Sequence, residues 1–459
     1  MRVCVQQFAH LRRSMCGSTD FRPSQGLRAL AAMIFKQIIV SLVLFAISVG
    51  SAEAQFSSPD IAASAPPISA QWFAMHTLIQ ADPWPTQEGI EFSSWRSVSA
   101  GIQWSSINTS PGVYDWGYFD RWMARASEYG QTVLYTVYAT PTWASSCPTC
   151  VCNQGNGAPG SCYPPNDLNS DGTGSDKHLK DFVTALMQHV GPGKIQVLEV
   201  WNEPNIPSEW GGTTQQLVSM ARDIRSVALS YDANIKISSP AETGDGKNNL
   251  NMLWLNSYLA AGGGAYVDII GLHGYVWNPE DIVARVSATT ADMQQYGQAS
   301  KPIWVTEGSW CCDYQSLPTN EQQGFSLRLA LAMISTPVSR FYLYAFDSTQ
   351  EANLWNPTTQ QLTPNATTYK LYYNWLVGAT ISQPCQPGTG QNNVIWSCFF
   401  TKPGGYQAEA IWNTALPVGQ TQRVAVSNQF VQYTDVNGIV HQIQNHQVPT
   451  SYNPIWLEN

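Results

Sequence analysis

Two glutamates, Glu203 and Glu307, follow apolar runs that are typical of buried strands. Glu203 lies in Val-Leu-Glu-Val-Trp-Asn-Glu-Pro-Asn, and Glu307 lies much later, in Lys-Pro-Ile-Trp-Val-Thr-Glu-Gly-Ser-Trp. Cleavage of a glycosidic bond needs one group that protonates the leaving oxygen and another that attacks or stabilises the developing oxocarbenium carbon. Two carboxyl groups can do both if their surroundings separate their pKa values. The pair therefore indicates glycosidase chemistry, and the uncharged, Trp-rich surroundings of Glu203 suit the proton donor.

Whether the two glutamate side chains can lie close together depends on how the strands that precede them are arranged. Between residues 70 and 380, short apolar runs alternate with longer helical patterns, which is typical of a parallel α/β sheet. Eight such runs predict a (β/α)8 TIM barrel, in which the C-terminal ends of the strands build the active site. A doubly wound sheet fits the same alternation, but no glycine-rich phosphate loop follows the first run. The predicted strands are Trp72–Met75, Arg96–Ile102, Thr132–Val137, Gln196–Trp201, Ile235–Ser238, Val267–Leu272, Ile303–Thr306 and Arg340–Ala345.

In this barrel Glu203 follows the fourth strand and Glu307 ends the seventh. On facing strands, two carboxyl groups can lie ~5–5.5 Å apart, which is the separation in a retaining glycosidase. Either glutamate alone could be an ordinary surface carboxylate. Both follow apolar runs at predicted catalytic ends of strands, however, and this placement favours a catalytic role for both.

The connecting helices have apolar residues repeating with the helical period. One helix begins at Asp176 and is stopped by Gly191-Pro192-Gly193, and another carries apolar residues from Leu217 to Ala228. A last helical stretch covers Thr367–Ala379.

Beyond residue 380 the pattern changes to short strands separated by Gly, Pro and Asn turns. We expect a small β-sandwich-like domain over residues 381–459, following a catalytic barrel over residues 55–380. A structural cover on the flank of the barrel is favoured over a separate carbohydrate-binding module, because the segment is small and contiguous. Its predicted strands are Asn393–Phe400, Gln407–Trp412, Gln422–Ala425, Val431–Asp435, Ile439–Gln442 and Ile455–Leu457.

Residues 1–54 predict an upstream segment followed by a secretory signal peptide. Lys36, the apolar run Ile38–Val49 and the small-residue site Ala52-Glu53-Ala54 have the order of such a peptide, and Met33 is its expected start. A membrane anchor is disfavoured, because the apolar run is shorter than the ~20 residues that span a bilayer. We therefore expect a secreted or periplasmic protein that starts near Gln55 and has no membrane partner after cleavage.

The remaining chain is acidic and rich in tryptophan. Removing residues 1–54 takes away six of the 23 Lys and Arg and two of the 32 Asp and Glu, which leaves a formal net charge of −13. An acidic chain without a basic cluster is a poor partner for nucleic acid or an anionic membrane. The 18 tryptophans suit stacking on sugar rings, although large apolar cores also use tryptophan.

Eight cysteines remain after residue 54, and export makes disulfides the expected state. The Cys-x-x-Cys-x-Cys cluster from Cys147 to Cys152 could instead hold zinc, but no histidines lie nearby in the sequence. Cys385 and Cys398 are expected to close a short local loop. The pairing of the others stays open: Cys147, Cys150, Cys152, Cys162, Cys311 and Cys312.

The motifs around both glutamates resemble those of the clan A retaining glycoside hydrolases, most closely family 39. Trp-Asn-Glu-Pro-Asn at 201–205 is similar to the acid/base motif, and Trp-Val-Thr-Glu-Gly at 304–308 is similar to the nucleophile motif. The likeness extends to Gly-Val-Tyr-Asp-Trp at 112–116, with Trp104 and Asp120, and to Thr-Pro-Thr-Trp-Ala-Ser at 140–145, and it covers nearly all of the chain after the signal peptide. The Asn-Glu-Pro motif is specific for the clan but says little about the substrate.

The resemblance implies a role for each residue of the motifs. Glu203 is the expected acid/base and Glu307 the expected nucleophile, while Asn202 matches the asparagine that hydrogen-bonds the sugar 2-hydroxyl. His273 and Tyr275, in Gly-Leu-His-Gly-Tyr, match positions that line the subsite next to the nucleophile. A histidine taken alone is more often a hydrogen-bonded structural residue, but the position of His273 at a strand end favours the site.

Further residues are weaker candidates for binding sugar. His76 follows the first strand, Trp310 lies three residues beyond the nucleophile, and Trp143 and Trp210 fall on loops of the same face. Packing in the core is an equal alternative for Trp310 and the favoured one for the other three residues. Arg96 resembles a clan arginine that supports the nucleophile electrostatically, and a structural salt bridge is an equal alternative.

Two departures from the relatives concern the loops that select the substrate. Many relatives carry an acidic residue shortly after the counterpart of Arg96, where this chain has Ser97-Val98-Ser99. The segment from Cys147 to Cys162 resembles an insertion in the third βα loop, and Cys311-Cys312 directly follows the nucleophile loop. We expect one or more disulfides to tie these two loops together.

The sequence therefore predicts a retaining O-glycoside hydrolase that cleaves a poly- or oligosaccharide without a metal or organic cofactor. A transglycosylase on the same scaffold and a non-catalytic glycan-binding barrel are the alternatives. Analysis of the products at high substrate concentration would distinguish a transglycosylase from a hydrolase. Binding without turnover across a polysaccharide panel would identify a glycan-binding barrel. The sugar, the linkage, and exo or endo action stay open, because the motifs do not describe the loops that select them.

Overall fold

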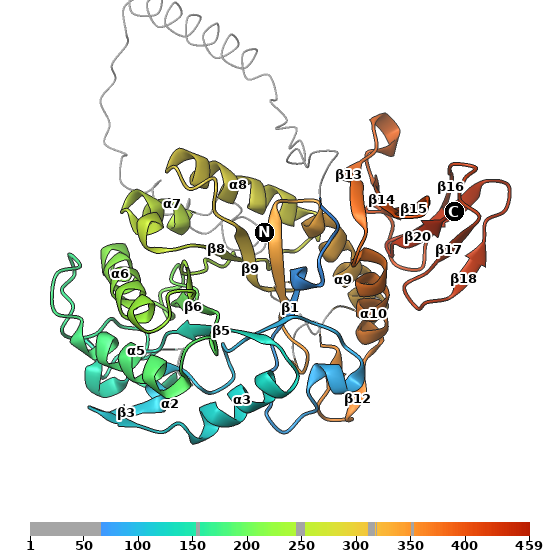
Figure 1. Ribbon diagram of the computed structural model, residues 1–459. Helices are drawn as coiled ribbons and strands as arrows, with labels where there is room; N and C mark the ends of the chain where they lie inside the picture. Colours follow the sequence, from blue (N-terminus) through green and yellow to red (C-terminus); the bar gives the residue numbers. More distant parts are fainter. Residues whose placement is uncertain (1–65, 153–156, 245–252, 311–316, 318, 350–352) are drawn as a thin grey trace, which may run out of the picture. The chain divides into compact units, whose positions relative to one another are not determined.

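The computed structural model describes residues 66–152, 157–244, 253–310, 317, 319–349 and 353–459 (Figure 1). The predicted signal peptide and the pair Cys311-Cys312 lie outside these ranges. No helix within the described ranges is long and apolar enough to cross a membrane.

Eight parallel strands form the barrel that the alternating pattern predicts, which confirms the fold class. Their order around the sheet is β7-β6-β5-β2-β1-β10-β9-β8, and bridges from Ser238 to Ile269 and from Glu242 to Leu272 join the two ends. Isolated hydrogen-bonded bridges, rather than a long ladder, thus close the sheet. The strands are β1 (Phe73–Met75), β2 (Ser94–Arg96), β5 (Thr132–Val137), β6 (Val197–Val200), β7 (Lys236–Ser238), β8 (Ile270–His273), β9 (Ile303–Gly308) and β10 (Val338–Leu343).

The second predicted strand, Arg96–Ile102, is wrong beyond its first residue. β2 ends at Arg96, and Ser99 and Gly101 have φ angles of 64° and 76°, which bend the chain out of an extended conformation. Val98, Ala100 and Ile102 are buried in the main core, so the apolar run belongs to a packed loop. The prediction mistook an apolar loop for an extended strand.

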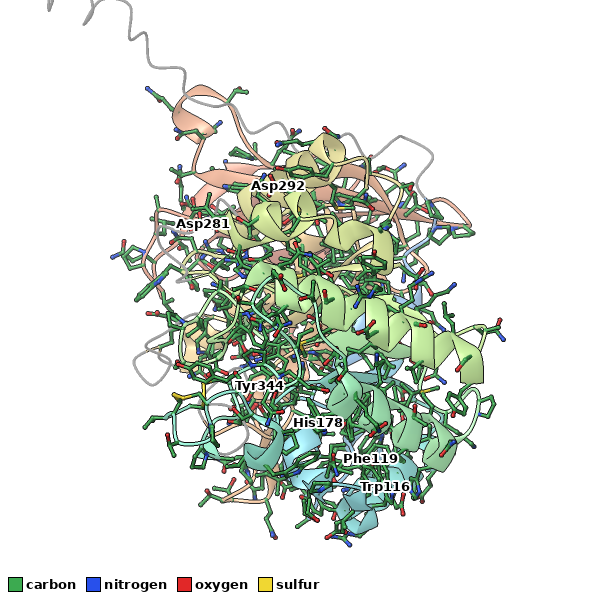
Figure 2. All side chains as sticks on the ribbon, turned by 90° about the vertical axis from the view of Figure 1, so that its left-hand side faces the viewer. Trp116, Phe119, His178, Asp281, Asp292 and Tyr344 are labelled. Carbon is green, nitrogen blue, oxygen red and sulfur yellow. A yellow bond between two sulfur atoms is a disulfide. The ribbon has the colours of Figure 1, made fainter. Side chains whose placement is uncertain are left out.

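Helices cover the outside of the barrel, as the 3.6-residue stripes predict. Helix α6 is fixed at its start by a capping box, in which Thr213 and Gln216 satisfy each other's backbone N–H. Trp116 and Phe119, at the start of α3, contact each other edge to face at 5.5 Å (Figure 2). The helices are α2 (Trp104–Ile107), α3 (Gly117–Glu128), α5 (Lys177–Val190), α6 (Thr214–Tyr231), α7 (Leu253–Ala260), α8 (Asp281–Gln295), α9 (Thr319–Ile334) and α10 (Pro364–Leu376).

Short elements fill the connections. Two small hairpins pair β3 (Asn108–Ser110) with β4 (Val113–Tyr114) and β11 (Trp355–Asn356) with β12 (Gln361–Leu362). Single turns of 3-10 helix lie at Ala70–Trp72, Pro85–Glu88, Thr142–Ala144, Gly263–Tyr266 and Gly390–Asn392.

The barrel interior changes from apolar to polar along the strands. Ala74, Leu134, Val197, Ile269 and Tyr342 form one buried apolar cluster inside the barrel. Because side chains alternate between the two faces of a strand, the residues two positions further along face inward as well. These include His76, Thr136 and Glu199, all fully buried. A polar layer therefore lies between the apolar layer and the C-terminal ends of the strands.

The C-terminal segment forms a six-stranded antiparallel sheet in the order β13-β14-β15-β20-β17-β18, with a separate pair β16–β19. Ile411, Phe430, Val448 and Leu457 form an apolar cluster between the two sheets, as expected for a sandwich-like arrangement. Strands β13 and β19 were missing from the prediction, and β13 contains two prolines that weaken its strand pattern. The strands are β13 (Thr380–Pro387), β14 (Ile395–Lys402), β15 (Tyr406–Asn413), β16 (Gln422–Ala425), β17 (Gln432–Thr434), β18 (Val440–Gln442), β19 (Gln447–Thr450) and β20 (Ile455–Glu458).

This sheet packs on helices of the barrel. Trp375 of α10 stacks on Trp456 of β20 with ring centroids 5.0 Å apart, and Trp412 Nε1 donates to Glu280 Oε1 at 2.7 Å. Figure 1 shows the sheet beside α9 and α10. The contacts bury large aromatic side chains, so the sheet protects one side of the barrel from solvent.

Candidate active site

Glu203 is positioned by an unusual turn at the end of β6. Trp201 and Glu203 have φ angles of 68° and 45°, and Glu203 N donates to Ala241 O at 3.1 Å. Positive φ is strained for residues other than glycine, and such strain persists only where the surroundings hold it. The buried indole of Trp201 supplies part of that support by donating from Nε1 to Glu209 O at 2.9 Å. The Glu203 side chain keeps 16% exposure and so reaches the open end of the barrel.

Glu307, near the end of β9, is held by two donors. Arg96 Nη1 donates to Glu307 Oε2 at 2.6 Å, and Tyr275 OH donates to Glu307 Oε1 at 2.6 Å. Each carboxylate oxygen therefore has its own partner, which fixes the plane of the group. An oxygen of Glu203 lies within 4.8 Å of an oxygen of Glu307.

Arg96 connects several carboxyl and amide groups of the site. It is fully buried, and besides Glu307 it donates from Nη2 to Asn202 Oδ1 at 2.8 Å. Its Nε and Nη2 both donate to Glu199 Oε2, at 2.8 and 2.6 Å. One guanidinium thus sets the positions of the predicted nucleophile and of Asn202.

Glu199 is a member of this network that the sequence analysis missed. It is fully buried on β6 and also accepts a hydrogen bond from Thr136 Oγ1 at 2.8 Å. The available signal was a lone carboxylate inside the apolar run Val-Leu-Glu-Val, four residues before Glu203. A buried charge needs a partner, so this residue required a cation inside the barrel.

Replacing Glu199 with glutamine should lower kcat by about 10–100-fold, because Arg96 loses its charged partner and Glu307 shifts with it. The variant should also lose roughly 3 kcal/mol or more of unfolding free energy, the cost of unpairing a buried charge. With Glu199 neutral, the positive field of Arg96 on Glu307 grows, so the acid limb of the pH–rate profile should move to lower pH.

Steady-state kinetics and thermal unfolding of Glu199→Gln test this expectation. Thr136→Val is the matched control, because it removes one hydrogen bond to the same Glu199 oxygen but leaves both charges in place, so it should cost less, about 1.5–3 kcal/mol. A Glu199→Gln variant with wild-type kcat and an unmoved acid limb would refute the positioning role.

His273 lies between the two candidate catalytic carboxylates. Its Nδ1 is 2.8 Å from Glu203 Oε1, and its Nε2 is 3.4 Å from Arg96 Nη2. Arginine can only donate, so Nε2 is the acceptor and Nδ1–H donates to Glu203. Burial lowers the pKa of His273 to about 4, which keeps the ring neutral near pH 7. The hydrogen bond stabilises the ionised form of the Glu203 carboxyl group.

Glu203, His273 and Glu307 also bring three potential metal-ligand atoms within 4.8 Å of one another. His273, however, directs Nδ1 to Glu203, while Nε2 faces Glu307 Oε2 at 3.8 Å. Ligands of one ion must converge on a single point. The two nitrogens face different carboxylates, so the ring is arranged as a bridge between them rather than as a ligand.

Burial raises the pKa of both Glu203 and Glu307 above the ordinary glutamate value. If Glu307 acts ionised and Glu203 acts protonated, as the sequence predicts, we expect a bell-shaped dependence of kcat/KM on pH. Activity falls at low pH as Glu307 gains a proton and at high pH as Glu203 loses one, and both limbs should lie above about 4.3.

His273 should add no limb of its own near neutral pH, because its pKa is about 4. Measuring kcat/KM from pH 3 to 10 on one aryl glycoside checks the bell-shaped profile and the absence of a limb from His273. A limb at about 6.5, the usual histidine value, that disappears in His273→Gln would contradict them.

The other predicted sugar-binding residues are mostly buried. His76 is fully buried and contacts Thr306 O through Nε2 at 3.0 Å, and Trp310 is 2% exposed and packs edge to face on Phe325 of α9. Trp210 packs on Trp201 with ring centroids 4.6 Å apart. Trp143, which is half-buried, donates from Nε1 to Asn108 O and contacts His178, labelled in Figure 2. Packing contacts therefore dominate the surroundings of all four.

Tyr138 and Tyr344, which the sequence analysis did not select, both contact Ser99 beside the network. Tyr138 OH accepts a hydrogen bond from Ser99 N at 3.3 Å, and Tyr344 OH donates to Ser99 Oγ at 3.3 Å. Tyr344 also lies 4.9 Å from His76 and 6.4 Å from Tyr275, measured between ring centroids. Ser99, in the Ser97-Val98-Ser99 segment that follows Arg96, thus contacts two tyrosine hydroxyls.

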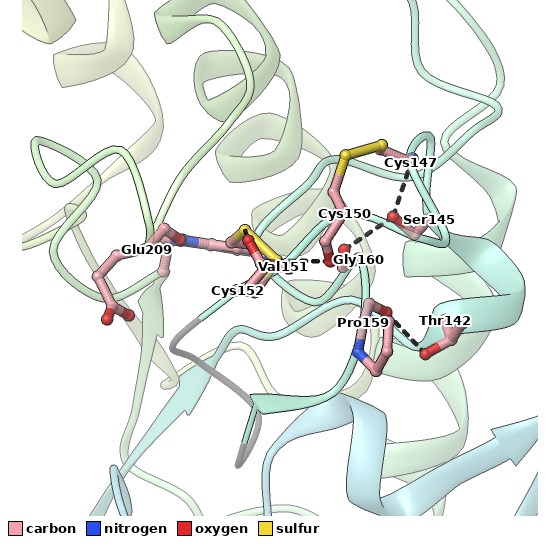
Figure 3. The surroundings of a disulfide bond; sticks show 11 residues. Thr142, Ser145, Cys147, Cys150, Val151, Cys152, Pro159, Gly160 and Glu209 are labelled. Atoms are coloured by element: carbon pink, nitrogen blue, oxygen red, sulfur yellow. Dashed lines mark hydrogen bonds between the residues drawn. A yellow bond between two sulfur atoms is a disulfide. The ribbon is translucent and has the colours of Figure 1, made fainter.

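The disulfide pairing corrects the expected link between the third βα loop and Cys311-Cys312. Cys147 pairs with Cys150 and Cys152 pairs with Cys162, so all four cysteines of the loop bond within it (Figure 3). The partners are only 3 and 10 residues apart, and short loops cost little closure entropy. The zinc alternative is wrong for the same reason, because disulfide sulfurs are not thiolate ligands. The predicted Cys385–Cys398 bond is confirmed.

Comparison with known proteins agrees with this architecture. Residues 172–369, which contain Glu203 and Glu307, match the family model described as glycosyl hydrolase catalytic core. No curated protein has significant sequence similarity to the chain.

Solved glycosidase structures share the fold at low sequence identity. A glucosidase from Croceicoccus marinus is 13% identical with a TM-score of 0.60, over 86% of this chain and 96% of that one. A β-xylosidase from Caulobacter crescentus is 13% identical with a TM-score of 0.57, over 86% and 97%. A glycoside hydrolase family 30 endoxylanase from Clostridium papyrosolvens is 13% identical with a TM-score of 0.54, over 85% and 96%. These similarities support the barrel fold, and the likeness to family 39 in particular stays a prediction.

Proposed function

We propose that the protein is a retaining O-glycoside hydrolase that acts on a poly- or oligosaccharide. The observation that carries the proposal is the pairing of Glu203 with Glu307 within 4.8 Å, each in a different setting. That separation suits an attacking carboxylate and leaves too little room for the water that an inverting enzyme places between its carboxyls. The match of residues 172–369 to a glycosyl hydrolase catalytic core supports the same reaction class.

Glu203 is the proposed acid/base. Its partial exposure and raised pKa suit a protonated carboxyl beside the leaving oxygen. After it gives up the proton, the Nδ1–H of His273 stabilises the carboxylate, which then activates water in the second step. The same group thus serves as acid and base in turn.

Glu307 is the proposed nucleophile. Arg96 and Tyr275 hold its two oxygens, so it is oriented before substrate arrives. It attacks the anomeric carbon to form a glycosyl-enzyme, while the leaving oxygen takes the proton from Glu203. Asn202, which is fixed by Arg96, is the proposed partner of the sugar 2-hydroxyl.

The proposed location of the protein is extracellular or periplasmic, in line with the predicted signal peptide and the three disulfides of the described residues.

Sugar specificity is assigned to the loops at the ends of the strands. Trp277, two residues beyond Tyr275, is 36% exposed and offers a more open aromatic surface than the buried candidates.

The test is the anomeric configuration of the first product. Aryl glycosides and polysaccharides are screened for turnover, and proton NMR then follows the hydrolysis of an active substrate from the first minutes. A product with the configuration of its substrate is expected. An inverted product would overturn the proposed mechanism, and binding without turnover across the panel would point to a glycan-binding barrel.

A further inference from the structure

Trp210 packs against the strained turn that carries Glu203. In this turn Trp201 and Glu203 have positive φ angles, 68° and 45°, which persist only where neighbouring groups hold them. The indoles of Trp210 and Trp201 meet edge to face, with ring centroids 4.6 Å apart. Trp210 is only 5% exposed, so its ring offers little surface to a sugar and instead contacts the turn.

Backbone hydrogen bonds also connect Trp210 to Glu203, in two steps. Ile206 N donates to Glu203 O at 3.0 Å, and Trp210 N donates in turn to Ile206 O at 2.9 Å. The Trp201 indole reaches the same segment by donating from Nε1 to Glu209 O at 2.9 Å. A displacement of Trp210 would therefore be transmitted to the backbone of Glu203 both directly and through Trp201.

The Trp210 ring is itself fixed by the segment that leads into α6. Its Nε1 donates to Thr213 O at 3.3 Å, and Thr213 is the N-cap residue of that helix. A Cβ atom at Gly212 would lie 2.4 Å from Cζ2 of the Trp210 ring, closer than side chains approach one another. Gly212 does not have a positive φ, so this glycine is needed for space and not for its backbone conformation.

The third βα loop holds the residue between them. Gly211 N donates to Cys162 O at 2.8 Å, and Cys162 is joined to Cys152 by a buried disulfide. The ring of Tyr163 lies against Gly211, where a Cβ atom would be 2.6 Å from Cε1 and Cζ of that ring. The segment around Trp210 is thus held by the start of α6 and by a loop that is cross-linked within itself.

We propose that Trp210 is a positioning residue for Glu203, which it keeps in place by supporting the strained turn through Trp201 and Ile206. The inference rests on the proposed acid/base role of Glu203. A misplacement of about 1 Å can cost 10²-fold in rate. Loss of Trp210 should therefore slow the steps that use Glu203, whereas loss of a residue that binds sugar would slow the reaction of every substrate.

Trp210→Phe tests the proposal on two substrates that share one sugar and differ in the leaving group. With the poor leaving group, which needs protonation, kcat/KM should fall by about 10–100-fold. With a dinitrophenyl leaving group, which needs none, kcat/KM should stay within about twofold of the wild-type value. The basic limb of the pH profile should also move to lower pH, because a looser turn loses part of the burial that raises the pKa of Glu203.

Trp456→Phe is the matched control for lost packing. Trp456 is also buried, donates one hydrogen bond from Nε1, to Tyr406 OH at 2.9 Å, and packs on another tryptophan, Trp375. It lies in the C-terminal sheet, on β20. The variant should lower Tm by about as much as Trp210→Phe, and it should keep both the wild-type leaving-group dependence and the basic limb.

Gly212→Ala is a second variant, which displaces the Trp210 ring without removing it. We expect the same selective loss on the poor leaving group. Gly117→Ala is its control, because the nearest atom would be 3.4 Å from the new Cβ atom, an ordinary contact distance.

Glu203→Gln is measured in parallel, so that the two proposals can fail separately. If Glu203→Gln shows the leaving-group dependence while Trp210→Phe and Gly212→Ala lose both substrates equally or keep the basic limb in place, the positioning role is wrong and the acid/base role stands. A selective loss in Trp456→Phe would also overturn the positioning role. If Glu203→Gln itself shows no leaving-group dependence, the proposed function is wrong and the role of Trp210 falls with it.

Discussion

Replacing Glu307 with glutamine should reduce kcat/KM by about 10⁴-fold or more, the largest loss expected from any single substitution in this chain. The amide cannot attack the anomeric carbon, so the glycosyl-enzyme does not form. The amide oxygen can still accept one hydrogen bond, from Arg96 or from Tyr275, and the group should keep its place. Stopped assays on an activated aryl glycoside, sensitive to slow turnover, measure the loss.

The matched control for Glu307 is Tyr275→Phe. It removes one donor to Glu307 Oε1 but leaves the carboxylate, so activity should fall by only about 10–100-fold. A second variant, Glu307→Gly, opens space for azide, which should restore turnover and give a glycosyl azide of inverted configuration. Wild-type rates in Glu307→Gln, or azide products of retained configuration, would show that Glu307 is not the nucleophile.

The barrel could be predicted because its signals are local. Strand β5 has the predicted bounds, and α5 begins one residue after the predicted Asp176, where an apolar stripe starts and a Gly-Pro-Gly sequence later ends it. The C-terminal ends of the fourth and seventh strands then placed Glu203 and Glu307 on one face. The spacing of the apolar residues and the Gly and Pro residues of the turns were therefore enough to predict the barrel. They were also enough to predict that Glu203 and Glu307 lie on the same face of it.

The supporting residues depend on contacts between distant parts of the chain, which the local patterns do not describe. Arg96 and Glu199 are separated by 103 residues, and their pairing follows only once β2 and β6 both face the barrel interior. The turn at Ser99 is similar: its positive φ and its two tyrosine partners convert an apolar run into a loop. The expected disulfide between the third βα loop and Cys311-Cys312 was wrong for the opposite reason, because a long-range link was expected where near neighbours bond.

Replacing Glu203 with glutamine should separate the two steps of the reaction. Loss of the general acid should cost about 10²–10⁴-fold on a substrate with a poor leaving group. A dinitrophenyl glycoside needs no protonation, so its first step should stay fast while the second step, which needs a base to activate water, becomes slow. The glycosyl-enzyme should then accumulate, visible as a burst of dinitrophenol and as an added mass on Glu307.

External nucleophiles and pH give the decisive measurements for Glu203. Azide needs no general base, so it should accelerate turnover of the dinitrophenyl substrate by Glu203→Gln and give a product of retained configuration, opposite to that from Glu307→Gly. The basic limb of the pH profile should also vanish in Glu203→Gln, because that limb reports the loss of the Glu203 proton. Glu209→Gln, in the same loop, is the control and should keep both the limb and the leaving-group dependence. A Glu203→Gln variant that lost activity toward all substrates equally, with no burst and no effect of azide, would exclude the acid/base role. Glu203 would then serve only to orient His273 through their hydrogen bond.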